Sequence, residues 1–86
     1  MPEISRFFGI IITLYYNDHA PAHFHVRYGE QKAVVTIEDF LIIEGSLSPR
    51  VRALVLEWAA LHHQELREDW NLAVQHAPLR SIAPLE

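Results

Sequence analysis

The first half of the chain follows the two-residue period of β-strands. Successive side chains of a strand point to opposite faces of a sheet, and polar and apolar residues alternate from His23 to Tyr28. A longer apolar run before this stretch is rich in isoleucine and aromatic residues, which favour strands, and both of its faces are apolar. Turn-forming Asn, Asp, Pro and Gly residues separate the apolar stretches. The predicted strands cover residues 7–16, 23–28, 32–38 and 40–44.

The second half of the chain changes to the three- and four-residue spacing of a helix. Ser48 is a good N-cap residue and Pro49 a good first helical residue, so a helix is predicted to begin there. The spacing continues over about residues 49–75, as one long helix or two in succession, and a break is expected at residues 66–69. The tail, residues 79–85, is expected to add a short edge strand or to pack across the helix.

Four strands followed by helix predict a single α+β domain over residues 1–86, with a mainly antiparallel sheet packed against the helical segment. The chain has 86 residues, half of them hydrophobic, which is enough for one domain with a core. A domain of this size buries only roughly 60–65% of its unfolded surface. We therefore expect a homo-oligomer or a partner to contribute to stability.

Charge and composition exclude some classes of function. The net charge of −4 argues against broad nonspecific binding to nucleic acid, but it allows a small local anion site. The chain has no cysteine, so any metal site must use histidine and carboxylate ligands. No segment reaches the ~18 apolar residues that a membrane span needs, and the first residues lack the features of a signal peptide. A cytoplasmic protein without a membrane partner is expected.

The residues most suited to chemistry lie in a turn predicted at residues 17–22 and in the strand after it. Three of the six histidines and an arginine fall within nine residues here. Because side chains alternate, His23, His25 and Arg27 are predicted to share one face, and Phe24, Val26 and Tyr28 are predicted to face a core. These three polar residues are the candidate catalytic residues. The candidate binding residues around them are Asp18, His19, Lys32 and Glu38, the last two on the strand predicted to pair with the histidine strand.

The motif NDHAPAHFHVRYGE, residues 17–30, resembles the signature of a family of small bacterial proteins described as domain of unknown function DUF4160. Further agreement extends from Ile4 to Leu85, so the resemblance covers nearly the whole chain. The chain departs from the family pattern at Ala22, where a second proline is common. Members are often encoded beside a second small uncharacterised protein, and the pair resembles a toxin–antitoxin module. The resemblance thus implies a protein partner and assigns no catalytic residue.

Our main expectation is therefore a component of a two-gene, toxin–antitoxin-like module that acts through a protein partner. The face formed by the histidines and Arg27 would be its recognition or active surface. One alternative is a small metal-independent ribonuclease that binds RNA. In it a histidine acts as general acid or base, Arg27 holds a phosphate, and Arg6 or Lys32 adds a further cation.

The other alternative is a metal-binding protein. Two histidines spaced i, i+2 on one strand face can reach the same ion, and a third from the preceding turn would complete the set. The ligands would be His19, His23 and His25, with Asp18 or Glu30 as a fourth, and the set suits Zn, Ni, Fe or Mn. Whether the protein is an enzyme stays open at this point.

Overall fold

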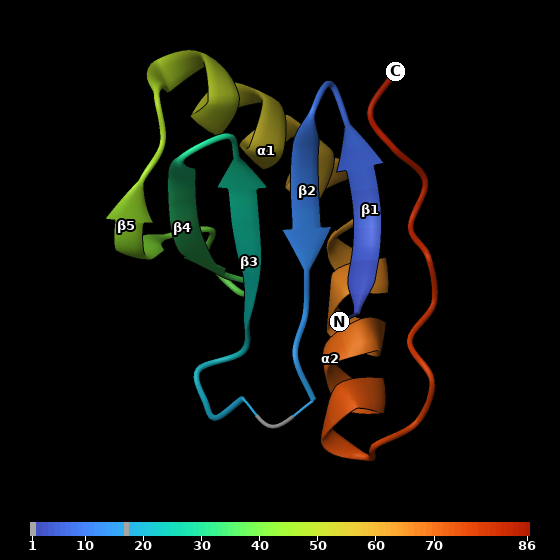
Figure 1. Cartoon of the computed structure of the whole chain (residues 1–86). Helices are drawn as coiled ribbons and strands as arrows, with labels where there is room; N and C mark the ends of the chain where they lie inside the picture. The colour runs from blue at the N-terminus through green and yellow to red at the C-terminus, as the bar shows by residue number, and fades with distance from the viewer. Residues whose placement is uncertain (1, 17) are drawn as a thin grey trace.

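The strands form one antiparallel sheet in which each strand lies beside the next along the chain, in the order β1-β2-β3-β4-β5 (Figure 1). The computed structural model describes residues 2–16 and 18–86. The predicted α+β class is confirmed, with five strands instead of four and two helices after them. The elements are β1 (Glu3–Phe7), β2 (Ile10–Thr13), β3 (His23–Tyr28), β4 (Gln31–Thr36), β5 (Ile42–Ser46), α1 (Pro49–Leu61) and α2 (His63–Val74).

The apolar run predicted as one strand over residues 7–16 instead contains the end of β1, a turn and the whole of β2. The chain turns at Phe8 and Gly9, which have φ angles of 51° and 81°. Phe7 of β1 then lies opposite Ile10 of β2 in an antiparallel pair. The prediction was wrong because the turn lies inside an apolar run, where only the glycine, which accepts positive φ at little cost, marks it. This hairpin accounts for the fifth strand.

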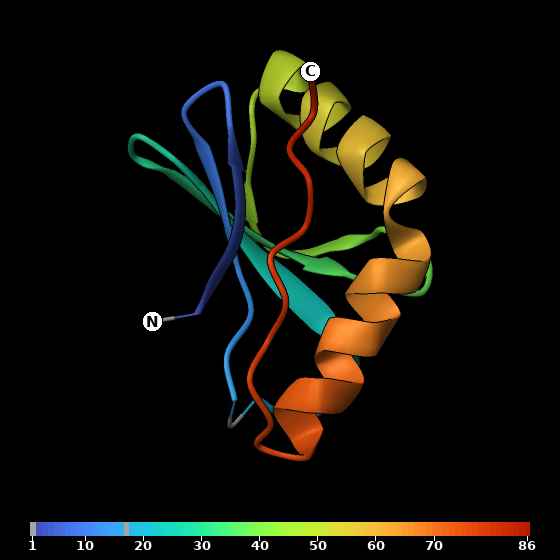
Figure 2. The same ribbon diagram turned by 90° about the vertical axis from the view of Figure 1, so that its right-hand side faces the viewer.

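The core lies between the sheet and the helices, which cover one face of it (Figure 2). Phe24 and Val26 of β3 point to this side and are buried, as their alternation predicts. Trp58 of α1 is fully buried, and its ring centroid lies 5.5 Å from that of Phe7 and 6.0 Å from that of Phe24. Tyr28, which was predicted to face the core, is 40% exposed because β3 ends there at the hairpin tip.

The helical segment begins where the sequence predicts and divides elsewhere. The Ser48 side chain accepts a hydrogen bond from the Val51 backbone N–H and caps α1. The two helices meet at His62, and the predicted break at residues 66–69 is wrong. Leu66 is fully buried inside α2, so this stretch contributes to the core as continuous helix. Among the described residues, no helix is long and apolar enough to cross a membrane.

The tail after α2 runs beside β1, at the edge of the sheet (Figures 1 and 2). The Ile82 N–H donates a hydrogen bond of 2.7 Å to the Ile4 carbonyl, yet the tail forms no regular strand. The Trp58 indole N–H donates to the Ala83 carbonyl at 2.9 Å. Ile82 and Leu85 are both buried. The tail therefore covers the β1 edge and closes the core on that side.

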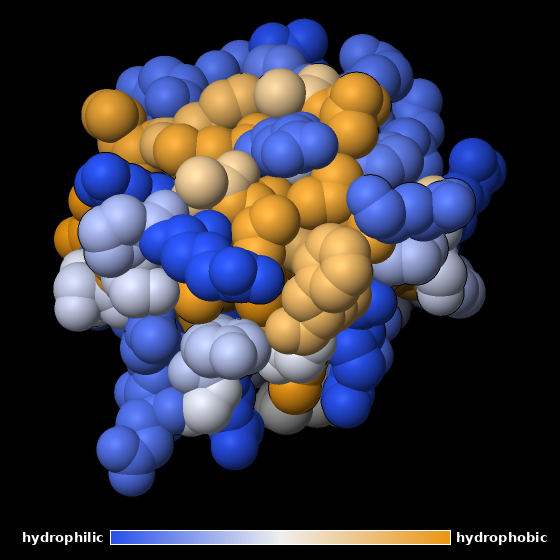
Figure 3. Space-filling view, turned by 90° about the horizontal axis from the view of Figure 1, so that it is seen from above, coloured by the Kyte–Doolittle hydropathy of each residue, from blue (hydrophilic) through white to orange (hydrophobic). Residues whose placement is uncertain are grey.

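Apolar side chains gather at the end of the molecule that carries the hairpin tips, with charged residues around them (Figure 3). Phe8, at the β1–β2 tip, is 58% exposed. Tyr28, at the end of β3, lies against Gly9. A Cβ atom added to that glycine would be only 3.2 Å from the tyrosine ring. The two hairpins thus contact each other at this end, and the other end of β3 carries the candidate site.

Candidate functional site

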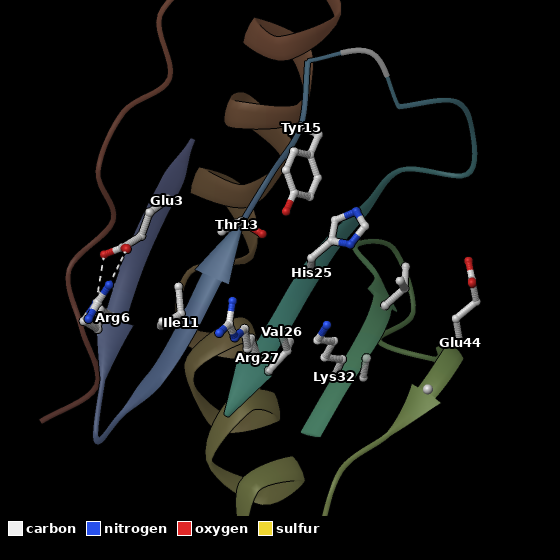
Figure 4. Close-up of a pocket in the computed structure, with 13 residues that line it drawn as sticks. Glu3, Arg6, Ile11, Thr13, Tyr15, His25, Val26, Arg27, Lys32 and Glu44 are labelled. Atoms are coloured by element: carbon white, nitrogen blue, oxygen red, sulfur yellow. Dashed lines mark hydrogen bonds and ion pairs between the residues drawn. The ribbon is translucent and has the colours of Figure 1, made fainter. Parts of the chain in front are cut away.

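The face of the sheet that turns away from the helices is hollowed, with a cavity volume of about 720 Å³ (Figure 4). All five strands contribute to its lining. Outward-pointing residues of β3 and β4 form its floor, as the alternation predicts. The register places Arg27 opposite Lys32, and His25 opposite Val34. We call this cavity the open-face hollow.

Cationic side chains are concentrated in the open-face hollow. Three of the seven Lys and Arg residues of the chain line it: Arg6, Arg27 and Lys32. Arg6 is paired with Glu3 at 2.8 Å, and this hydrogen bond lowers the pKa of Glu3 and raises that of Arg6. Arg27 and Lys32 form no ion pair with any carboxylate of the described residues. The middle of the hollow therefore offers two cations to a ligand.

A compact cluster of Asp18, His23 and His25 lies where β3 begins. One carboxylate oxygen, Oδ2 of Asp18, is 3.0 Å from Nε2 of His23 and 3.0 Å from Nε2 of His25. The three ligand atoms lie within 4.8 Å of one another. His25 also lines the open-face hollow, so the cluster and the hollow are continuous. We call these three residues the Asp-His-His cluster.

Neighbouring aromatic rings hold the two imidazoles of the Asp-His-His cluster. The Tyr15 ring meets His25 edge to face, with centroids 4.6 Å apart, and the two side chains adjoin at one end of the hollow (Figure 4). The Trp70 ring of α2 lies 5.4 Å from that of His23. Nδ1 of His23 is 2.6 Å from the Pro21 carbonyl oxygen. Contacts from the segment after β2, from the turn at Pro21 and from α2 thus fix the positions of the two imidazole rings.

The structure separates other predicted site residues from this cluster. His19 is exposed and lies outside the group of ligand atoms, although it is next to Asp18 in the chain. Glu30 is exposed in the β3–β4 turn, at the far end of β3 from His23. Of the predicted ligands, the structure brings together His23, His25 and the possible fourth ligand Asp18. Asn17, the first residue of the predicted turn, lies outside the described residues.

Glu38, expected either to turn into solvent after the strand or to lie across from the histidine strand, does not pair with that strand. The pairing of β3 with β4 ends at His23 and Thr36, so Glu38 is already beyond the strand. Its carboxylate accepts two hydrogen bonds, of 3.1 and 3.0 Å, from the Arg67 guanidinium of α2. The strand prediction ran two residues too far because the turn after Thr36 carries no glycine or proline.

Sequence reasoning missed three contributors to the site. Tyr15 and Trp70 hold the histidine rings, and Glu44 of β5 lines the hollow. No local pattern marks them, because each comes from a different element and reaches the site only through the tertiary fold. Lys32, which sequence reasoning did select, is on the open face as predicted.

Comparison with known proteins gives a family. The family described as Domain of unknown function (DUF4160) matches residues 9–71, which include β2 to β5, α1 and the Asp-His-His cluster. No curated protein matches the chain, and no solved structure does. Since the match covers well over half of its length, the chain belongs to the DUF4160 family.

Proposed function

We propose that this protein is one component of a two-gene, toxin–antitoxin-like module and acts by binding an acidic segment of its protein partner in the open-face hollow. The observation that carries the proposal is the pair of cations at the centre of the hollow. Arg27 and Lys32 lie opposite each other on β3 and β4, and no carboxylate of the described residues neutralises either of them.

The charge of the hollow contrasts with that of the whole chain. The chain has 11 acidic and 7 basic residues, yet the hollow is lined by three of the basic residues and two of the acidic ones, Glu3 and Glu44. Glu3 is already paired with Arg6. Complementary charge selects partners and speeds association, so a carboxylate-bearing segment is favoured at the centre of the hollow.

The surroundings of the hollow favour a protein segment over a long nucleic acid. A duplex or long strand follows an extended basic surface and makes many phosphate contacts. Here the basic patch is confined to a cavity of about 720 Å³ in a chain of net charge −4. A short acidic segment needs only the hollow, whereas a long polyanion would also meet the net negative charge of the rest of the chain.

The test is co-purification with the product of the neighbouring gene. The two proteins are expressed together, with the affinity tag on the partner, and the double variant Arg27→Glu, Lys32→Glu is compared with the unchanged chain. We expect the variant to weaken the complex at least about tenfold, because it replaces two attractions by two repulsions. Binding of the unchanged chain is expected to weaken as salt rises.

The matched control is Arg50→Glu, Arg52→Glu, which changes the net charge by the same amount on exposed positions of α1. We expect this variant to co-purify normally. If the two double variants weaken the complex equally, or if the partner does not bind the unchanged chain, the proposal is wrong. Degradation of RNA by the purified protein, abolished by His25→Ala, would instead establish the ribonuclease.

A further inference from the structure

We propose that the Asp-His-His cluster is a metal centre, in which Oδ2 of Asp18 and Nε2 of His23 and His25 bind one divalent transition-metal ion. The inference goes beyond the proposed function and needs no partner protein. It rests on the distances between the three ligand atoms, on the hydrogen bond that orients His23, and on the burial of the cluster.

The distances suit ligands that share one ion. Zinc binds imidazole nitrogen and carboxylate oxygen at about 2.0–2.2 Å. Two ligand atoms on one ion therefore lie about 2.8–3.1 Å apart where the angle at the ion is near 90°, and about 3.3–3.6 Å apart at the tetrahedral angle. Both Nε2 to Oδ2 distances in the cluster are 3.0 Å. All three atoms also lie within 4.8 Å of one another, so small side-chain rotations place one ion in contact with each.

The orientation of His23 points to a cation beside its Nε2 atom. A carbonyl oxygen only accepts hydrogen bonds, so Nδ1, 2.6 Å from the Pro21 carbonyl, carries a hydrogen and donates it. In a neutral imidazole, Nε2 then presents a lone pair, and it faces the carboxylate oxygen of Asp18 at 3.0 Å. Two acceptors at this distance repel each other unless a cation or a second proton lies between them.

The same hydrogen bond is the usual partner of a metal-binding histidine. Such a histidine donates its other ring N–H to a carboxylate, a backbone carbonyl or water, which fixes its tautomer and orientation. The Pro21 carbonyl takes this part for His23. The Trp70 ring beside His23 and the Tyr15 ring beside His25 restrict both imidazoles further. The cluster is therefore organised before any ion arrives.

Burial leaves one side of the cluster accessible. The His23 side chain is 9% exposed, whereas those of Asp18 and His25 are 24% and 30% exposed. An ion at the cluster would thus have three protein ligands and remain open to solvent beside the hollow. Two histidines and one carboxylate with open positions are typical of catalytic zinc sites and non-haem iron sites, and the donor set also suits Ni and Mn.

The test is direct titration of metal into untagged protein that has been stripped of metal with a chelator and dialysed. Zn²⁺, Ni²⁺, Mn²⁺ and, under anaerobic conditions, Fe²⁺ are titrated separately by calorimetry. We expect about one equivalent of at least one of these ions to bind. Asp18→Asn and His25→Ala are expected to weaken that binding at least about tenfold, since each removes a ligand.

His19→Ala is the matched control, because His19 is exposed in the same turn and lies outside the ligand group. It is expected to bind metal as the unchanged chain does. A thermal melt guards against misfolding: the bound ion should raise the Tm of the unchanged chain and of His19→Ala, but not that of Asp18→Asn. No binding of any of the four ions, or equal binding by all variants, would overturn the metal centre.

Discussion

At the scale of single residues, Asp69 is the buried group with the clearest electrostatic signature. Its side chain is 1% exposed, and Oδ1 accepts a hydrogen bond of 2.9 Å from the Arg80 backbone N–H. Oδ2 has no hydrogen-bond partner among the described residues. Burial raises the pKa of Asp69 above its ordinary 3.8, and nearby Glu65 and Glu68 act in the same direction, while Arg80 opposes them. The ionised carboxylate therefore costs stability that the neutral form would not.

The substitution Asp69→Asn tests this cost. Because the pKa is raised on folding, the native state binds the proton more tightly than the unfolded state. The protonated Asp69 side chain therefore stabilises the folded protein fully below pH 3.8, and this stabilisation is lost as the pH rises through the folded-state pKa. Asparagine does not titrate, so the free energy of unfolding of the variant, relative to the unchanged chain, should increase as the pH rises above about 4. Urea unfolding at several pH values measures it, and a difference that stays constant would contradict the raised pKa.

At the scale of elements, the pairing of β4 with β5 depends on one glycine. Gly45 has a φ angle of 75° and lies opposite Ala33. A Cβ atom on Gly45 would be 2.0 Å from the Lys32 carbonyl oxygen, which is backbone and cannot move aside alone. β5 also supplies Glu44 to the open-face hollow, so this close approach of two backbones helps to shape the candidate site.

We expect Gly45→Ala to destabilise the protein by at least about 2 kcal/mol, from the left-handed backbone and the contact with Lys32 together. Gly29→Ala is the matched control, since Gly29 also has a positive φ, of 58°, but no atom lies within 4 Å of its Cβ position. Gly29→Ala should lower the free energy of unfolding by only roughly 1–2 kcal/mol. Urea unfolding compares the two, and an equal loss would show that the approach to Lys32 does not matter.

At the scale of the whole molecule, the tail joins parts that are distant in the sequence. Ile82 bonds to the backbone of β1, the Ala83 carbonyl accepts from Trp58 of α1, and the Arg80 N–H donates to Asp69 of α2. The tail covers the β1 edge while both helices cover one face of the sheet (Figure 2). The opposite face carries the open-face hollow, and His25 joins the hollow to the Asp-His-His cluster.

We expect Ile82→Ala to destabilise the protein by about 2–4 kcal/mol, because it leaves a cavity between the tail, β1 and the helices. Ile82 is 4% exposed, whereas its neighbour Ser81 is exposed, so Ser81→Ala serves as the control and should change the free energy of unfolding by less than about 0.5 kcal/mol. Thermal or urea unfolding measures both. A loss for Ile82→Ala as small as that of the control would mean that the tail is not part of the core.

The sequence by itself determined the α+β class, the start of the helical segment at Ser48, and the strand that carries the site. It also placed His25 and Arg27 on the face opposite to Phe24 and Val26. These features follow from rules that act over a few residues: the period of a strand, the period of a helix and the chemistry of an N-cap. The NDHAPAHFHVRYGE motif indicated the family for the same reason, since it is a continuous stretch of chain.

Only the tertiary structure decided which side chains meet. It placed a turn inside the first apolar run, brought Asp18 to both histidines, left His19 outside the cluster and paired Glu38 with Arg67. Each of these outcomes depends on where a strand ends and on the path that a turn takes. A shift of one or two residues there moves a side chain to another face or another partner, so local patterns do not determine it.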